Sequence, residues 1–154
     1  MKIRVSAVQY HLHTISSFEE FAQQCEHYVK TAQEYGSEFV LFPEFFTTQL
    51  LSIGSEQGTR LTINELPGFT EQYLNLFQNF ALETGMYIIG GTHVIAREGK
   101  LYNVAHMFYP DGRIVEQAKF YITFTEVNDW IVSAGEDFSV FDRLKGRIAI
   151  LACS

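Results

Sequence analysis

This sequence has few cysteines, no clusters of basic residues and no long apolar runs. Two cysteines among 154 residues cannot form the disulfide framework of a small secreted domain. The 11 Lys and Arg residues are scattered against 18 Asp and Glu residues, so the net charge of −7 argues against nucleic acid or an anionic membrane as partner. The first residues, MKIRVSAVQYHLH, lack the long apolar stretch of a signal peptide, and no run in the sequence approaches membrane-spanning length. These absences predict a cytoplasmic protein whose thiols stay reduced.

Apolar residues, by contrast, are abundant. They make up 47% of the sequence, and aromatic residues alone make up 15%. This content is enough for the hydrophobic core of one domain. Because no repeat, low-complexity tract or Pro/Gly/Ser linker interrupts the chain, we predict no internal domain boundary.

The segment SSFEEFAQQCEHYVKTAQEYG, residues 16–36, has the periodicity of an amphipathic helix. Its apolar residues recur at i, i+3, i+4 and i+7, which places them on one face. Ser16 and Glu19 have the spacing of a capping box, and Gly36 supplies a C-terminal stop. Cys25 falls on the apolar face, so we interpret it as a core residue.

A second helix is predicted for residues 67–85, with Thr70 as its N-cap and Gly85 just beyond its end. The alternation of helices with strand-like segments predicts an α/β fold in which helices pack on a sheet. The apolar runs 39–42 and 148–151 indicate strands covered on both faces. The predicted strands, with a turn at 110–112, are 3–10, 38–42, 86–96, 101–109, 113–124, 138–142 and 147–153.

Glu44 directly follows an apolar strand and Pro43, and two phenylalanines follow it. A carboxylate among aromatic rings loses hydration, which suits it to exchange protons near neutral pH. The alternative is a solvated loop glutamate with no chemical role.

Cys153 stands at the carboxyl end of the last predicted strand, an edge where α/β sheets gather ligands and reactive groups. A free thiol is mostly protonated at neutral pH, so a nucleophilic cysteine needs a neighbouring base. Glu44 also ends a strand and could be that base. The alternative is an inert core cysteine, because cysteine is among the most buried residue types.

Lys119 lies between Ala118 and Phe120 in an aromatic strand-like region. A lysine here is either a functional cation or a side chain that reaches to water from a sheet edge. Glu126, seven residues later, is either a surface charge or a partner of this region.

Taken in chain order, these elements resemble the carbon–nitrogen hydrolase (nitrilase) superfamily, whose triad is Glu, Lys and Cys. Four stretches are similar to its motifs: LFPE at 41–44, LYNVAHMFYPDGRI at 101–114, KFYITFTE at 119–126 and GRIAILAC at 146–153. Two positions depart from the family pattern. Tyr121 stands where the family often has His, and Phe124 stands where it often has Pro. Both positions shape the pocket in the family, so the substrate stays open.

The resemblance implies a fold and a mechanism. The fold would be an α-β-β-α sandwich in which residues 1–154 form the N-terminal part of a single domain, with its C-terminal portion absent from this chain. Glu44 would take the proton of Cys153, Lys119 would stabilise the tetrahedral intermediate, and Glu126 would orient Lys119 or the substrate. The implied reaction is hydrolysis of a non-peptide C–N bond, in an amide rather than a nitrile, through a thioester.

The resemblance implies no metal and no cofactor, and a homodimer is a further expectation. The spacing of the five histidines also matches no common zinc pattern; they are His11, His13, His27, His93 and His106. The pair Gly90–Gly91 lacks the spacing of a phosphate-binding loop and is typical of close strand packing.

Two other functions stay open from the sequence. The chain could be a truncated, non-catalytic fragment or interaction module of the same fold, since an apolar strand without its neighbour exposes a backbone edge. It could also be an acyltransferase of the same superfamily that passes the thioester to an amine.

Overall fold

The computed structural model describes residues 2–55, 58–59, 61–143 and 146–152, and the predicted α/β class is confirmed. Its main sheet has the strand order β1-β2-β3-β4-β5, with β6 paired to β4. Strands β1, β2 and β3 run parallel, whereas β4 is antiparallel to both β3 and β5. The strand bounds are β1 Val5–Ala7, β2 Phe39–Leu41, β3 Tyr87–Arg97, β4 Lys100–Phe108, β5 Ile114–Ala118 and β6 Val132–Ser133.

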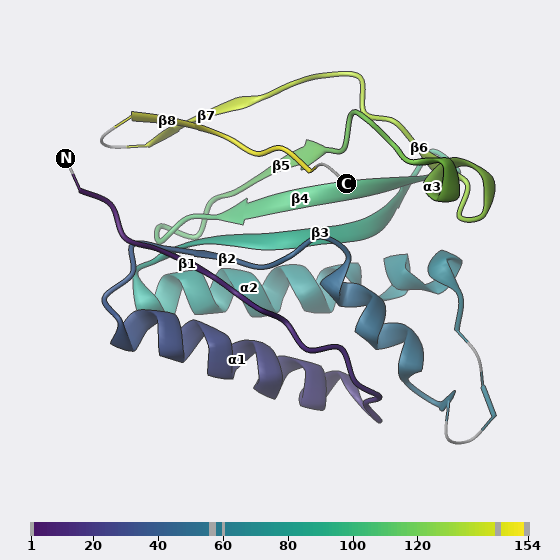
Figure 1. Cartoon of the computed structure of the whole chain (residues 1–154), viewed down its shortest axis with the longest axis horizontal. Helices are drawn as coiled ribbons and strands as arrows, with labels where there is room; N and C mark the ends of the chain where they lie inside the picture. Colours follow the sequence, from purple (N-terminus) through teal and green to yellow (C-terminus); the bar gives the residue numbers. More distant parts are fainter. Residues whose placement is uncertain (1, 56–57, 60, 144–145, 153–154) are drawn as a thin grey trace.

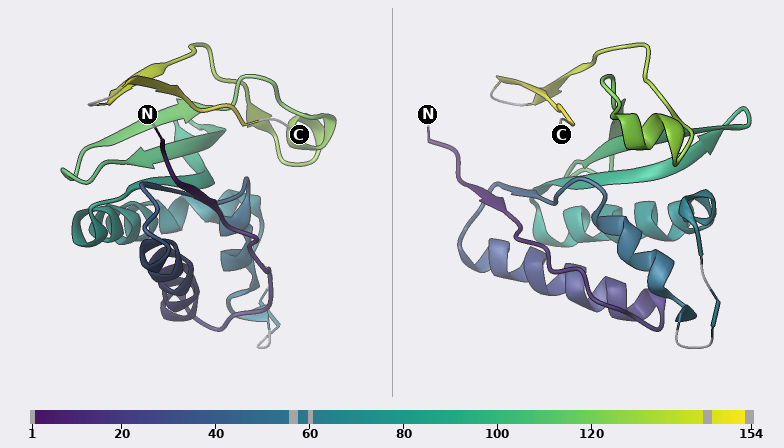
Figure 2. Two further views of the ribbon diagram at one scale, coloured as in Figure 1. Left: turned by 60° about the vertical axis from the view of Figure 1, so that its left-hand side comes forward. Right: turned by 45° about the vertical axis from the view of Figure 1, so that its right-hand side comes forward.

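The main sheet separates two helices from a two-stranded ribbon. Helices α1 and α2 cover one face of the sheet (Figure 1), and β7 and β8 lie over the other face (Figure 2). The larger core fills the helix side, and a smaller cluster that includes Phe39, Met107 and Ile150 packs toward the ribbon. The bounds are α1 Phe18–Glu34, α2 Thr70–Thr84, β7 Val140–Arg143 and β8 Gly146–Ala149. The layers therefore follow the order helices, sheet and further strands.

Helix α1 is present as predicted, but its cap lies one residue later than expected. Ser17 is the N-cap, with extended backbone angles, and its hydroxyl accepts a hydrogen bond from the Glu20 amide. The Glu20 carboxylate accepts hydrogen bonds from the amide and the hydroxyl of Ser16, at 2.8 and 2.7 Å. Ser16 and Ser17 thus both make hydrogen bonds at the N-terminus of α1. The capping-box pairing of Ser16 with Glu19 that the sequence predicted is wrong, because Glu20 is the partner of Ser16. Gly36 has the left-handed φ of 65° expected after a helix.

Helix α2 does not use Thr70 as its N-cap. A 3-10 helix, Ile63–Phe69, leads straight into it, and the capping box lies at Thr62 and Glu65. The Thr70 hydroxyl is therefore free to contact the ring of His93, 3.1 Å away. Gly85 ends α2 in the left-handed conformation, as predicted. No helix in the described part of the chain is both long and apolar enough to cross a membrane.

Several predicted strands are shorter than expected, and the first, 3–10, is a strand only at Val5–Ala7. The segment 113–124 leaves the sheet after Ala118 and enters a short helix, α3 Phe124–Asn128, because Thr123 and Glu126 form a capping box that starts a helix. The last strand ends at Ala149, and Leu151 is 76% exposed. The prediction that this run is covered on both faces is therefore wrong for the described residues. Cys153 lies outside them.

Two histidines are buried in the helix-side core. His93 lies between the hydroxyls of Thr47 and Thr70, each 3.1 Å from a ring nitrogen, and its ring stacks on Tyr73. Burial lowers the pKa of His93 to about 3. Burial also lowers the pKa of His106 to about 4, against the opposing effect of the Glu116 carboxylate.

These histidines predict acid sensitivity. In the unfolded chain both rings bind a proton near their ordinary pKa of 6.5, whereas in the folded protein they stay neutral. The unfolded state therefore binds more protons, and stability should fall as the pH drops below 6.5, by about 1.4 kcal/mol per pH unit for each histidine. Urea unfolding between pH 7 and pH 4 measures this slope. His106→Leu should reduce it and the exposed His27→Gln should not; an unchanged slope in His106→Leu would contradict the prediction.

Candidate active site

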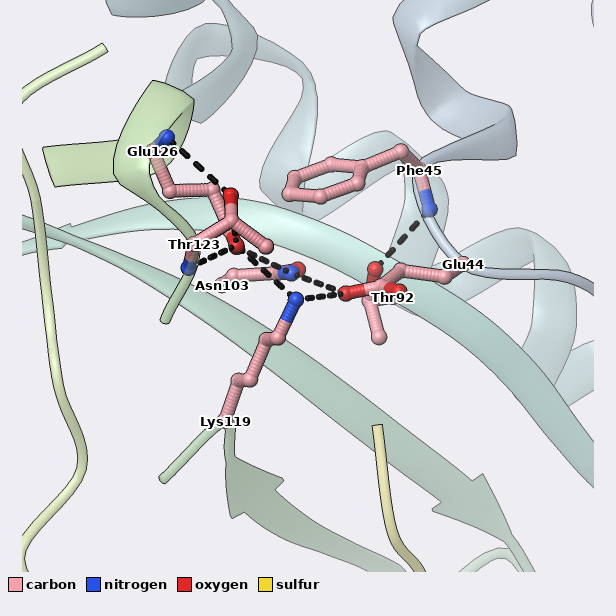
Figure 3. Close-up of polar contacts among 7 residues, drawn as sticks. All are labelled: Glu44, Phe45, Thr92, Asn103, Lys119, Thr123 and Glu126. Atoms are coloured by element: carbon pink, nitrogen blue, oxygen red, sulfur yellow. Dashed lines mark hydrogen bonds and ion pairs between the residues drawn. The ribbon is translucent and has the colours of Figure 1, made fainter. Parts of the chain in front are cut away.

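The structure brings three of the four predicted site residues together (Figure 3). The Lys119 ammonium lies 2.8 Å from Glu44 Oε1 and 2.8 Å from Glu126 Oε2. Glu44 follows β2, Lys119 follows β5, and Glu126 lies in α3. Cys153 is outside the described residues, but Ala152, its neighbour in sequence, lines the same cavity as Glu44.

Two further residues of the site were missed from the sequence. The Asn103 amide donates to Glu44 Oε1 at 2.9 Å and to Glu126 Oε1 at 3.2 Å. Thr123 donates to Glu126 Oε2 from both its backbone amide and its hydroxyl, each at 2.8 Å. The Thr-x-x-Glu spacing of a capping box was a usable signal for Thr123. Asn103 stands in the family-like stretch 101–114, but the sequence does not show its contacts with Glu44 and Glu126, because these partners lie 59 and 23 positions away.

The two glutamates have different surroundings. Glu126 Oε2 accepts three hydrogen bonds, from Lys119 and twice from Thr123, and the Glu126 side chain is 2% exposed. The Glu44 side chain is 22% exposed, and its two bonds, from Lys119 and Asn103, both go to Oε1. Within the described residues, Glu44 Oε2 accepts no hydrogen bond. Glu126 is thus a fixed anion, whereas Glu44 keeps one oxygen available for proton transfer.

The polar contacts keep both Lys119 and Glu126 ionised. Burial by itself lowers the pKa of Lys119, but the hydrogen bonds and charges of Glu126 and Glu44 outweigh it and raise that pKa above its usual range. Burial likewise tends to raise the pKa of Glu126, and its bonds with Lys119, Thr123 and Asn103 reverse this and lower it. Lys119 is therefore a permanent cation at neutral pH, suited to stabilise developing negative charge.

An unusual backbone path places Glu44. Phe45 has the left-handed φ of 57°, and its amide donates to Thr92 Oγ1 at 2.9 Å. Thr92 follows a register shift in the β3–β4 pairing, at Gly90–Gly91. A Cβ at Gly91 would lie 2.1 Å from the Pro43 carbonyl oxygen. The close approach expected at the glycine pair is present, but at Gly91 it is made by the loop before Glu44 and not by a neighbouring strand.

Two cavities lie beside these residues. One, of about 290 Å³, is lined by Glu44, Thr92 and residues 150–152, and the other, of about 360 Å³, is lined by Lys119, Tyr121 and the same residues 150–152. Tyr121, the first departure from the family pattern, thus borders a cavity beside Lys119. Phe124, the second, is exposed at the start of α3.

An α/β fold with a buried lysine held between two glutamates is typical of an enzyme active site, and comparison with known families gives the family. The chain belongs to the carbon–nitrogen hydrolase family, whose model matches residues 4–154.

The chain is similar to several curated proteins. It is 44% identical over 151 residues to the probable hydrolase YhcX of Bacillus subtilis (strain 168), covering 98% of this chain and 29% of that protein. It is 29% identical to omega-amidase NIT2 of Xenopus tropicalis, covering 99% of this chain and 55% of the relative. The bovine omega-amidase NIT2 is 30% identical, with coverage of 97% and 54%. The chain therefore spans about half the length of the omega-amidases and less than a third of the Bacillus protein.

Solved structures share the fold. Saccharomyces cerevisiae Nit3, of the nitrilase superfamily, superposes with a TM-score of 0.75 at 18% identity, covering 98% of this chain and 55% of Nit3. The NitN amidase from Nesterenkonia sp. AN1 gives a TM-score of 0.74 at 14% identity, with coverage of 99% and 57%. At these identities the similarity shows the architecture, which is that of the nitrilase superfamily.

Proposed function

We propose that residues 1–154 are the N-terminal part of one carbon–nitrogen hydrolase domain, which cleaves a non-peptide C–N bond through a cysteine thioester. The observation that carries the proposal is the Lys119 ammonium held between two carboxylates of unequal availability, Glu44 and Glu126. Cys153 is the nucleophile in this proposal. Its support is the family motif, together with the position of Ala152 on the Glu44 cavity.

The roles follow from the chemistry of each group. Glu44, through Oε2, takes the proton of Cys153, and the thiolate attacks the carbonyl carbon of the substrate. Lys119 stabilises the negative charge that develops on the carbonyl oxygen, as a preorganised cation. Glu44 then gives the proton to the departing amine or ammonia, which leaves an acyl group on Cys153. Water activated by Glu44 releases the acid, and Glu126 holds Lys119 in place throughout.

An amide is the substrate class with the best support. Relatives at 29% and 30% identity are omega-amidases, and the Nesterenkonia protein of the same fold is an amidase. In one structure of that amidase, acrylamide is bound covalently to the active-site cysteine by Michael addition. A small amide therefore reaches the thiol in that protein. The cavity of about 290 Å³ beside Glu44 matches a small molecule rather than a polymer.

Trapping the acyl-enzyme tests the proposal. The protein, expressed with its full natural reading frame, is mixed with small primary amides, quenched in acid and digested for mass spectrometry, while released ammonia is measured in parallel. The acyl mass should be found on the peptide that contains Cys153, and both signals should vanish in Cys153→Ala.

Cys25 provides the matched control for the acyl-enzyme experiment. Its thiol lies on the buried face of α1, where burial raises its pKa, so Cys25→Ala should retain both ammonia release and the adduct. Ammonia release that continues in Cys153→Ala would overturn the thiol mechanism. A folded wild-type protein that hydrolyses no amide in the panel would overturn the substrate class.

A further inference from the structure

Asn103 occupies the middle of the site without being one of the groups that carries the chemistry. It lies in β4, the strand between β3 and β5, and is 1% exposed. Its backbone carbonyl accepts the amide of Lys119 at 2.8 Å. Its side-chain amide donates to both glutamates, as Figure 3 shows. One residue therefore touches the lysine and both of its carboxylate partners.

The orientation of the Asn103 amide follows from its partners. Carboxylate oxygens only accept hydrogen bonds, so Nδ2 and not Oδ1 must face Glu44 and Glu126. Oδ1 is then buried, with no hydrogen-bond partner among the described residues. A buried acceptor without a partner is unfavourable, and an apolar side chain of similar size would avoid it. The position of the NH₂ group is thus the property that makes asparagine useful here.

The charges around Asn103 explain why a neutral donor fits. Two carboxylates surround one ammonium, so the cluster carries an excess negative charge. A third carboxylate at this position would add repulsion, and a second cation would neutralise Glu44, which must accept a proton. The amide adds a donor to each carboxylate without changing the charge. On Glu44 it binds the same oxygen as Lys119, and that leaves Oε2 open.

We propose that Asn103 is a positioning residue that holds Glu44 by one oxygen and thereby keeps the other oxygen directed to proton transfer. The catalytic part of this inference, proton transfer by Glu44, rests on the proposed function. The two carboxylates would otherwise compete for Lys119, and Glu44, the more exposed one, could turn either oxygen toward the ammonium.

Two substitutions of nearly equal size test the role. Asn103→Leu removes the donor, and kcat should fall by roughly 10- to 100-fold at every pH with KM within about twofold, because a hydrogen bond to a charged group is lost. Asn103→Asp can donate only when its new carboxyl is protonated. Its activity relative to wild type should therefore rise as the pH is lowered, with the optimum shifted to acid.

Gln117→Leu is the matched control. Gln117 is a buried amide on the neighbouring strand β5, with hydrogen bonds to the backbone of Ala118, Asp137 and Ser139. Among the described residues it has no hydrogen bond to either glutamate. This variant should lose stability but keep kcat and the shape of the pH profile. Wild-type kcat in Asn103→Leu would overturn the proposal. So would an equal loss of kcat in Gln117→Leu with no change in the pH profile of Asn103→Asp.

A readout without substrate separates this proposal from the proposed function. NMR of the glutamate side-chain carboxyl carbons follows the titration of Glu126, whose charged neighbours are Lys119 and Glu44. In Asn103→Leu this titration should move to higher pH, because a donor to the ionised form is lost. If the wild type hydrolyses no amide, the function fails while this shift still supports the role of Asn103 in holding the carboxylates. An unchanged titration overturns that role.

Discussion

Replacing Lys119 by methionine should abolish most of the activity and destabilise the fold at the same time. The Lys119 side chain is 1% exposed, and its ammonium is the partner of both Glu44 and Glu126. Removing one partner of a buried ion pair typically costs about 3–5 kcal/mol, because it leaves an uncompensated charge. We assign most of this cost to Glu126, which has almost no access to water. Losing a preorganised donor to the oxyanion should lower kcat on the order of 10²–10³-fold.

Urea unfolding and ammonia release measure the two effects of Lys119→Met separately. The double variant Lys119→Met/Glu126→Gln removes the stranded charge, so it should recover part of the stability and none of the activity. Lys30→Met serves as the control, because Lys30 pairs with Glu26 on the exposed face of α1 and should have little effect on either measurement. A stable, fully active Lys119→Met would contradict both the energetic and the catalytic role.

Adding one methyl group at Gly91 should cause the second large effect. Gly91 has a φ of 58°, which costs a residue with a Cβ about 1–2 kcal/mol. That Cβ would also lie 2.1 Å from the Pro43 carbonyl oxygen, and such overpacking adds about 1–3 kcal/mol. Gly91→Ala should therefore lose about 3 kcal/mol of stability. It should also lower kcat, since relief of the clash moves the loop that holds Glu44.

Gly99→Ala separates the two contributions at Gly91. Gly99 has a similar positive φ of 75°, but its Cβ would meet nothing within 4 Å. It should show only the conformational cost and retain wild-type kcat. Urea midpoints and steady-state kinetics of both variants test this. Equal destabilisation by the two substitutions would show that the contact with Pro43 is not limiting.

The local signals in the sequence predicted local structure well. The periodicity of 16–36 and the glycines at 36 and 85 correctly predicted helices and their ends, because these signals act within a few residues. The errors in predicting helix ends and strand ends also arose from signals a few residues apart. Ser17 replaced Ser16 as the cap, and the 113–124 strand became a helix start at Thr123, where a capping box outweighed aromatic strand character.

Motifs in the sequence predicted the family, which the family model confirms, and named Glu44, Lys119 and Glu126 as candidates that the structure brings into contact. The nucleophilic role of Cys153 stays a prediction. Three features are visible only in the folded protein. Glu126 is more enclosed than Glu44, Asn103 hydrogen-bonds to both glutamates, and Gly91 leaves space for the carbonyl of Pro43. The physical reason is distance along the chain. The hydrogen bonds that Glu44 receives from Asn103 and Lys119 join residues 59 and 75 positions apart, and only the register of the sheet brings such pairs together.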